Sequence, residues 1–223
     1  MQKTTSDHAI AIVKAGLSAL PVVGGPLASL LGDYLPTHTQ LAIERLLAEL
    51  AARLGRVEDR LDLESVNKDE LAELFKSSYL LTIRTHQEEK LKGAAGLLVN
   101  LLLRPGDPAR LSYEELDHFA RCLDVLSIGA LRVLIIASTF AESHGRPGAD
   151  SARFNFEDLR SRLPGTPSDL LMGLVGELNA MNLLHLAGVP GIRTENYGNY
   201  PIELTKLGLG LVHRVIEVDR AAR

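Results

Sequence analysis

A long apolar stretch, residues 8–35, dominates the pattern near the start of the chain. Between Ala9 and Gly32 the only charged side chain is Lys14, and the run Pro21-Val22-Val23-Gly24-Gly25-Pro26 interrupts the stretch. Proline ends one helix and is well accepted at the first position of the next. The pattern therefore predicts a hairpin of two short helices with these candidate membrane or assembly residues: Ile12, Leu20, Val22, Val23, Gly24, Gly25, Leu27, Leu30 and Leu31.

Three environments are open to this apolar hairpin: the protein core, an interface, or a membrane surface on which it lies. A continuous transmembrane helix needs about 20 apolar residues, which the proline and glycine break disfavours. A cleaved secretory signal is also disfavoured, because Lys14 and the same break divide the apolar run. The sequence leaves the choice among the three environments open.

An amphipathic helix is predicted from Gln40 to about Asp62. Its apolar positions alternate spacings of four and three residues, which is the pattern of a heptad seam. A seam this short favours packing inside a helical bundle over an independent coiled coil. The seam consists of Ile43, Leu47, Leu50, Leu54, Val57 and Leu61.

Capping signals predict further helices on both sides of a strong break. Asn67 and Ser112 each precede an apolar helical pattern and are followed three positions later by a glutamate. Between them, residues 86–103 form a leucine-rich helical pattern, which the run from Arg104 to Pro108 ends. We therefore expect a helical domain over residues 1–108 and a second domain over residues 109–223.

In the second predicted domain, the spacing of apolar residues changes near the end from a helical period to the alternation of strands. The pattern predicts two helices over residues 112–140, a short helix after Asn155 and a helix to about Asn182. Short strands at 183–187 and 200–204 follow, and a closing helix runs from Lys206 to Val218. Helices followed by a β-hairpin and a closing helix are typical of a winged helix-turn-helix. The predicted fold class is thus mainly α: a helical bundle followed by a winged-helix-like domain.

Composition supports a helical, intracellular protein. Hydrophobic residues make up 46% of the 223 residues, which is enough for real cores, and aromatic residues make up 4%. The net charge of −4 gives no overall attraction to a polyanion. Cys122 is the single cysteine, which excludes an intrachain disulfide and a zinc-thiolate cluster and suits the cytoplasm.

Four segments give the chain a resemblance to a known family. They are the hairpin around Pro-Val-Val-Gly-Gly-Pro, the helix EEKLKGAAGLLVNLLL, the pair YEELDHFARCLDVLSIGALRVL, and the closing LLMGLVGELNAMNLLHL with YPIELTKLGLGLVHRVI. Together they resemble the bacterial abortive-infection alpha proteins and related helical phage-defence proteins. The resemblance implies a host-defence protein that acts through interaction, and it transfers no catalytic residue.

No motif in the sequence predicts an enzyme. His118 has Glu114 and Asp117 nearby, but the spacing is not that of a zinc-binding His-Glu-x-x-His helix. Gly24-Gly25 lacks the lysine and the strand-turn-helix context of a phosphate-binding loop. Cys122 follows a helical apolar pattern, which favours a buried and inert thiol. We expect no catalytic residue, no metal and no cofactor.

The predicted winged helix raises the question of DNA binding. A recognition helix uses Lys, Arg, Asn or Gln to reach phosphates and base edges. The helix from Pro167 to Asn182 has no Lys or Arg and carries Asp169 and Glu177. Nucleic acid is therefore disfavoured, with Arg160, Arg162 and Arg193 as candidate backbone contacts in that alternative.

Three functions are consistent with these patterns. The first is a non-enzymatic anti-phage defence protein that binds a protein partner and uses the apolar hairpin on a membrane or in homo-oligomeric assembly. It would be cytoplasmic, or peripheral at the inner membrane. The second is a cytoplasmic winged-helix regulator that binds nucleic acid, and the third is a structural subunit of a larger complex.

Overall fold

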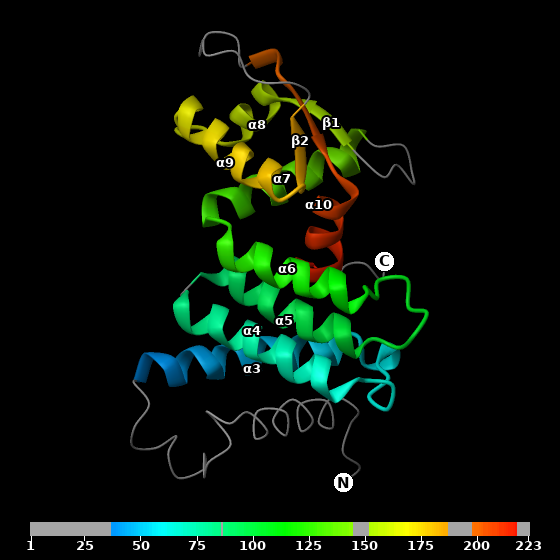
Figure 1. The fold of residues 1–223 in the computed structure, drawn as a ribbon. Coiled ribbons are helices and arrows are strands. Elements are labelled where there is room, and N and C mark those ends of the chain that lie inside the picture. Colours follow the sequence, from blue (N-terminus) through cyan, green and yellow to red (C-terminus); the bar gives the residue numbers. More distant parts are fainter. Residues whose placement is uncertain (1–36, 86, 145–151, 187–197, 218–223) are drawn as a thin grey trace. The chain divides into compact units, whose positions relative to one another are not determined.

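The computed structural model describes residues 37–85, 87–144, 152–186 and 198–217 (Figure 1). They form two compact units. The first contains the described residues up to Asp124 together with those from His213 onward, and the second is Val125–Val212. The apolar hairpin predicted over residues 8–35 lies outside the described residues. The boundary expected near residue 108 lies inside the first unit, because contacts of its neighbour Asp107 tie that turn to Arg60.

Stacked helices build the first unit (Figure 1): α3 (Thr37–Arg56), α4 (Lys68–Arg84), α5 (Glu88–Leu102) and α6 (Tyr113–Val125), which ends at the boundary between the units. A 3₁₀ turn (Glu58–Arg60) follows α3. The two predicted helix starts are observed, because Asn67 accepts from the Asp69 N–H and Ser112 accepts from the Glu115 N–H. α5 packs against α3 and α4, and its residues from Gly93 to Leu102 are all buried.

The buried face of α3 differs in part from the predicted seam. Leu50, Leu54 and Val57 are fully buried, as a core seam requires. Ile43, Leu47 and Leu61 are only half-buried. Ala42 and Leu46 take the buried positions in the first half of the helix. The buried stripe follows steps of four from residue 42 to residue 50, which the 3.6-residue period of a single helix accommodates.

Four helices and a three-stranded antiparallel sheet make up most of the described part of the second unit. The elements in chain order are α7 (Ile128–His144), β1 (Ala152–Asn155), α8 (Phe156–Arg162), α9 (Ser168–Ala180), β2 (Leu184–Leu186), β3 (Pro201–Leu204) and α10 (Lys206–Gly210). The sheet order is β1-β3-β2, with Phe154 opposite Ile202 and Leu184 opposite Leu204. α7 packs against α9 and β1.

The mainly helical fold class and the small antiparallel sheet are confirmed. The sheet has one strand more than expected, because β1 pairs with β3 across about 50 positions of the chain. The closing helix also differs from a regular α-helix. α10 passes directly into a π-helical segment, Leu211–Ile216, in place of the expected α-helix to Val218.

Candidate functional site

The outward face of α9 bears on the DNA-binding alternative, because α9 corresponds to the helix predicted from Pro167 to Asn182. Leu171, Leu174, Val175 and Leu178 form the buried face of this helix. The opposite face exposes Asp169, Gly173 and Ala180, and the Leu170 side chain is 55% exposed. The exposed surface of α9 is therefore apolar, small and acidic, with no cationic side chain in the helix.

Glu177, the second acidic residue of this helix, has a structural role. Its carboxylate accepts hydrogen bonds from the Ser127 N–H at 2.9 Å and the Ser127 hydroxyl at 3.1 Å. The Ser127 hydroxyl in turn accepts from the Ala130 N–H, so both side chains stabilise the start of α7. A carboxylate is favourable there because the N-terminus of a helix carries partial positive charge. Glu177 is thus not a free surface anion.

Two of the three arginines considered for nucleic-acid contacts, Arg160 and Arg162, make local contacts. Arg160 forms an ion pair with Glu157 at 2.8 Å, one turn away on α8. The Arg162 guanidinium lies over the Phe140 ring, 5.3 Å from its centroid. Arg193 lies outside the described residues.

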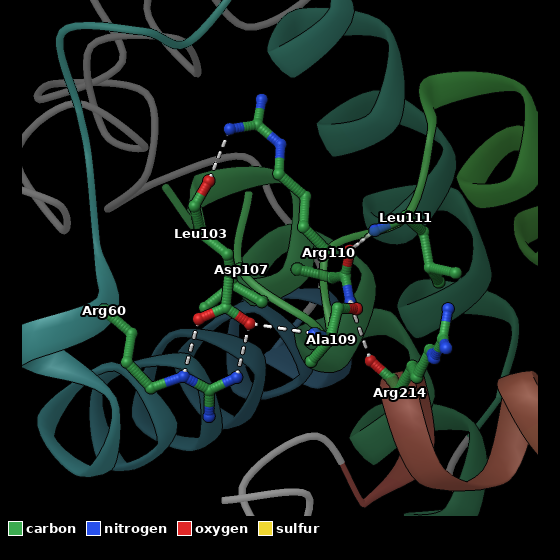
Figure 2. A network of polar contacts seen from close by, with 8 residues as sticks. Arg60, Leu103, Asp107, Ala109, Arg110, Leu111 and Arg214 are labelled. Carbon is green, nitrogen blue, oxygen red and sulfur yellow. Dashed lines mark hydrogen bonds and ion pairs between the residues drawn. The ribbon is translucent and has the colours of Figure 1, made fainter. Parts of the chain in front are cut away.

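A network of buried polar contacts lies in the first unit (Figure 2). Arg60 and Asp107 form a two-pronged ion pair with donor–acceptor distances of 2.7 and 2.9 Å. Asp107 also accepts from the Ala109 N–H at 2.9 Å, and Arg110 donates to the Leu103 carbonyl at 2.6 Å. The Arg60 guanidinium lowers the pKa of Asp107, and the same hydrogen bonds raise the pKa of Arg60. Both groups are therefore held in their charged forms.

Asn100, fully buried on α5, links the turn after α5 to residues 214–216. We call residues 214–216 the C-terminal segment. Its amide nitrogen donates to the carbonyls of Ala109 at 2.8 Å and Arg214 at 2.9 Å. Its amide oxygen accepts from the Leu111 N–H at 2.9 Å. A fully buried amide is tolerated because both its donor and its acceptor atoms are paired.

Arg53 of α3 is the second buried donor to the C-terminal segment. Its side chain is 3% exposed and donates to the carbonyls of Val215 at 3.2 Å and Ile216 at 2.9 Å. The third guanidinium contact is to the carboxylate of Glu49 at 2.7 Å, one helical turn earlier. Together with Asn100, Arg53 satisfies three successive carbonyls at the end of a helix.

Gly96 lets the C-terminal segment approach α5. A Cβ atom built at this position would lie 1.8 Å from the carbonyl oxygen of Val215. Any other residue would displace one of the two segments. We call Arg53, Gly96 and Asn100 the socket.

Cys122 and His118 are the strongest remaining candidate pair for chemistry. The thiol sulfur lies 3.4 Å from the His118 Nε2 atom, one turn away on α6. Burial raises the pKa of the Cys122 thiol to about 11, so the thiol is protonated at neutral pH. A nucleophilic cysteine needs the opposite shift, which supports the expectation of an inert thiol.

The remaining features of the described residues concern metals and membranes. Within these ranges no group of three or more His, Cys, Asp or Glu side chains is arranged to hold a metal ion. No helix in the described part of the chain is long and apolar enough to cross a bilayer. Neither the metal finding nor the membrane finding covers the predicted hairpin, since residues 1–36 are not described.

Sequence reasoning missed the socket. Arg53 occupies the apolar stripe three positions after Leu50, and Asn100 interrupts the leucines of α5. A polar residue on an apolar helix face signals a buried contact, although the sequence does not identify the partner.

Comparison of this chain with protein-family models, with curated proteins and with solved structures finds no match.

Proposed function

We propose that this chain is a non-catalytic interaction protein of the anti-phage defence type that its sequence patterns resemble. In this proposal the second unit binds a protein partner through the outward face of α9. The apolar segment 8–35 acts as the effector, either at a membrane surface or in self-assembly.

The element order of the second unit supports a winged-helix interpretation. Helix, strand, helix, helix, strand, strand is the order from α7 to β3, and the strand order β1-β3-β2 suits it. In that arrangement α9 takes the place of the recognition helix, the element that such domains present to a partner.

The composition of the outward face of α9 is the observation that carries the proposal. A surface that docks on a phosphate backbone gains its affinity from Lys and Arg side chains. α9 has neither, and it exposes Asp169 beside Leu170. An exposed leucine among small residues fits a protein partner, whose interface buries apolar side chains at its centre.

Liposome flotation of the full chain tests the effector part of the proposal. Vesicles with anionic lipids should carry the wild-type protein to the top of a density gradient. Val23→Asp should abolish flotation, because an aspartate would have to lose its water shell in the bilayer. Thermal melting of both proteins separates this effect from misfolding. A wild-type chain that neither floats nor self-associates would refute the effector role.

One feature favours a second candidate, a nucleic-acid-binding regulator. Arg160 and Arg162 are exposed on α8, the helix before α9. Fluorescence anisotropy with labelled duplexes at physiological salt separates the two functions. The interaction proposal expects no sequence-selective binding, whereas nanomolar and selective binding that is lost in Arg160→Ala/Arg162→Ala would overturn it.

A further inference from the structure

The outward face of α3 carries no charged side chain over the second half of the helix. Between Arg45 and Arg56 every exposed position is alanine or glycine, namely Ala48, Ala52 and Gly55. Exposed positions of a surface helix are usually charged or polar, so this composition is unusual. A Cβ atom built at Gly55 meets no atom within 4 Å. The surface here is therefore apolar, low and open.

Leu41 extends this surface toward the start of the helix, because its side chain is 53% exposed. Leu41, Ala48 and Gly55 follow one another at intervals of seven residues, which is close to two helical turns. They therefore lie in one line along the helix. α3 packs against α5 and α4 through its buried stripe, and it lies at the edge of the stacked helices in Figure 1. We call Leu41, Ala48, Ala52 and Gly55 the α3 face.

The α3 face has the shape that a second helix needs. The distance between the axes of two packed helices depends on the side chains at the contact, and small side chains allow a close approach. At 1.5 Å per residue the face is about 21 Å long. A helix that lies along it would remove apolar surface of both helices from water.

The apolar segment 8–35 is the occupant that the chain itself provides. Residues 9–32 carry one charged side chain, Lys14, so exposing them all to water is costly. Residues 32–36 form a connection of five residues to the start of α3, a usual length between two packed helices. The connection keeps the segment near the α3 face at an effective concentration on the order of millimolar.

The length of the segment also fits the α3 face. The part before Pro21 reaches back to the first apolar residue, Ala9. As a helix, residues 9–20 would span roughly 17 Å, compared with about 21 Å for the α3 face. One half of the predicted hairpin is thus long enough to cover Ala48 and Ala52.

We propose that the apolar segment 8–35 packs on the α3 face in water and leaves this face when it acts. The inference rests on the proposed effector role, to which it adds an off state. Alanine and glycine offer little apolar area, so the contact is weaker than core packing and can be released. The α3 face and the effector's target compete for the same apolar side chains of the segment.

Thiol labelling of the full chain tests the docking. Cys122 is fully buried and burial raises its pKa to about 11, so a maleimide reports on an added cysteine. Ala48→Cys lies on the α3 face, and Ala180→Cys, at an exposed position of α9, is the matched control. Each rate is divided by the rate of the same variant in urea. We expect Ala48→Cys to be protected at least about tenfold more than Ala180→Cys.

Two aspartates in the segment should remove this protection. Ile12→Asp/Leu30→Asp places a carboxylate in each half of the predicted hairpin, and docking would have to strip water from both. In this background Ala48→Cys should react as fast as Ala180→Cys, while circular dichroism melting shows that the helices stay folded.

Three results would overturn the docking. The first is an Ala48→Cys chain that reacts as fast as Ala180→Cys without the aspartates. The second is protection that the aspartates leave unchanged. The third is protection that grows with protein concentration, which would place a second copy of the chain on the α3 face.

Flotation with anionic vesicles and sedimentation test the off state separately from the docking. Ala48→Gln fills the space above the α3 face without adding charge, and Ala180→Gln is its control. Ala48→Gln should float, or self-associate, at a roughly tenfold lower concentration of lipid or protein than wild type. If both proteins respond at equal concentrations, the off state is refuted even when Ala48→Cys is protected. If neither floats nor self-associates, the effector role fails, and thiol labelling still decides the docking.

Discussion

Arg60 and Asp107 form a two-pronged ion pair between positions that are 47 residues apart in the chain. The Nε–Oδ2 distance is 2.9 Å and the Nη2–Oδ1 distance is 2.7 Å. This pair fixes the turn after α5 to the 3₁₀ turn after α3. A break rich in proline and glycine is thus an internal turn of the first unit, where sequence reasoning expects a linker.

Removing one partner of this pair should destabilise the protein strongly. Asp107 is 2% exposed and Arg60 is 11% exposed, so Asp107→Ala leaves a guanidinium in a buried site without its counterion. A change of this kind costs about 3–5 kcal/mol. Urea unfolding measures it. The matched control is Asp124→Ala, which breaks the exposed pair with Arg84 and should cost less than about 1 kcal/mol. Equal costs for both variants would contradict the burial argument.

The same pair should make stability depend on acid. The pKa of Asp107 is lowered in the folded protein because Arg60 holds the charged carboxylate. A lowered pKa means that the unfolded chain takes up the proton first as the pH falls. The contribution of the pair is complete above the ordinary aspartate pKa of about 4 and is lost as the pH drops below it. Urea midpoints should fall more for wild type than for Asp107→Asn between about pH 5 and pH 2. Parallel curves would argue against the pair as the cause.

Local signals account for the parts of the fold that the sequence predicts well. Asn67, Ser112, Asn155 and Thr205 are all observed as helix caps, and each acts on backbone within three residues of itself. Such contacts depend on neighbouring residues alone, so the local sequence is enough to predict where a helix begins. Helix periodicity predicts the burial of Leu50, Leu54 and Val57 for the same reason.

Distant partners explain what the sequence does not reveal. β1 is a strand because β3 lies beside it, and the alternation of apolar and polar residues from Ala152 to Asn155 is too short to predict a strand by itself. Arg53 is buried on an apolar helix face because its acceptors are about 160 positions away. The outward face of α9 was predictable in composition. The hydrogen bonds that Glu177 accepts from Ser127 were not predictable, since Ser127 lies 50 positions earlier.

The central residue of the α3 stripe should carry a large share of helix packing. Leu50 is fully buried, and Leu50→Ala should create a cavity that costs about 2–5 kcal/mol. Leu41 on the same helix is 53% exposed, so Leu41→Ala should stay within about 0.5 kcal/mol of wild type. Thermal melting and sedimentation are run on the same samples. A Leu50→Ala protein that dissociates but melts like wild type would place this stripe in a subunit contact.

The single thiol should be unreactive in the folded protein. Cys122 is fully buried, and burial raises its pKa to about 11, so at pH 8 only about one thiol in a thousand is ionised. The thiolate is the form that attacks Ellman's reagent. We expect the folded protein to react at least about a hundredfold more slowly than the protein in urea. Similar rates in both states would show that Cys122 is accessible and activated.

The carboxylate of Glu177 should stabilise the second unit by capping α7. Glu177→Ala removes both acceptors of Ser127 and should cost about 1–3 kcal/mol. Glu177→Gln keeps one acceptor oxygen but loses the charge at the helix N-terminus, so it should cost about 0.5–1 kcal/mol. The control is Glu157→Ala, which breaks an exposed pair with Arg160 and should stay under about 1 kcal/mol. Urea unfolding followed by circular dichroism gives the ranking. If Glu177→Ala proved as stable as Glu157→Ala, the carboxylate would be a surface anion after all, and α9 would expose two acidic side chains.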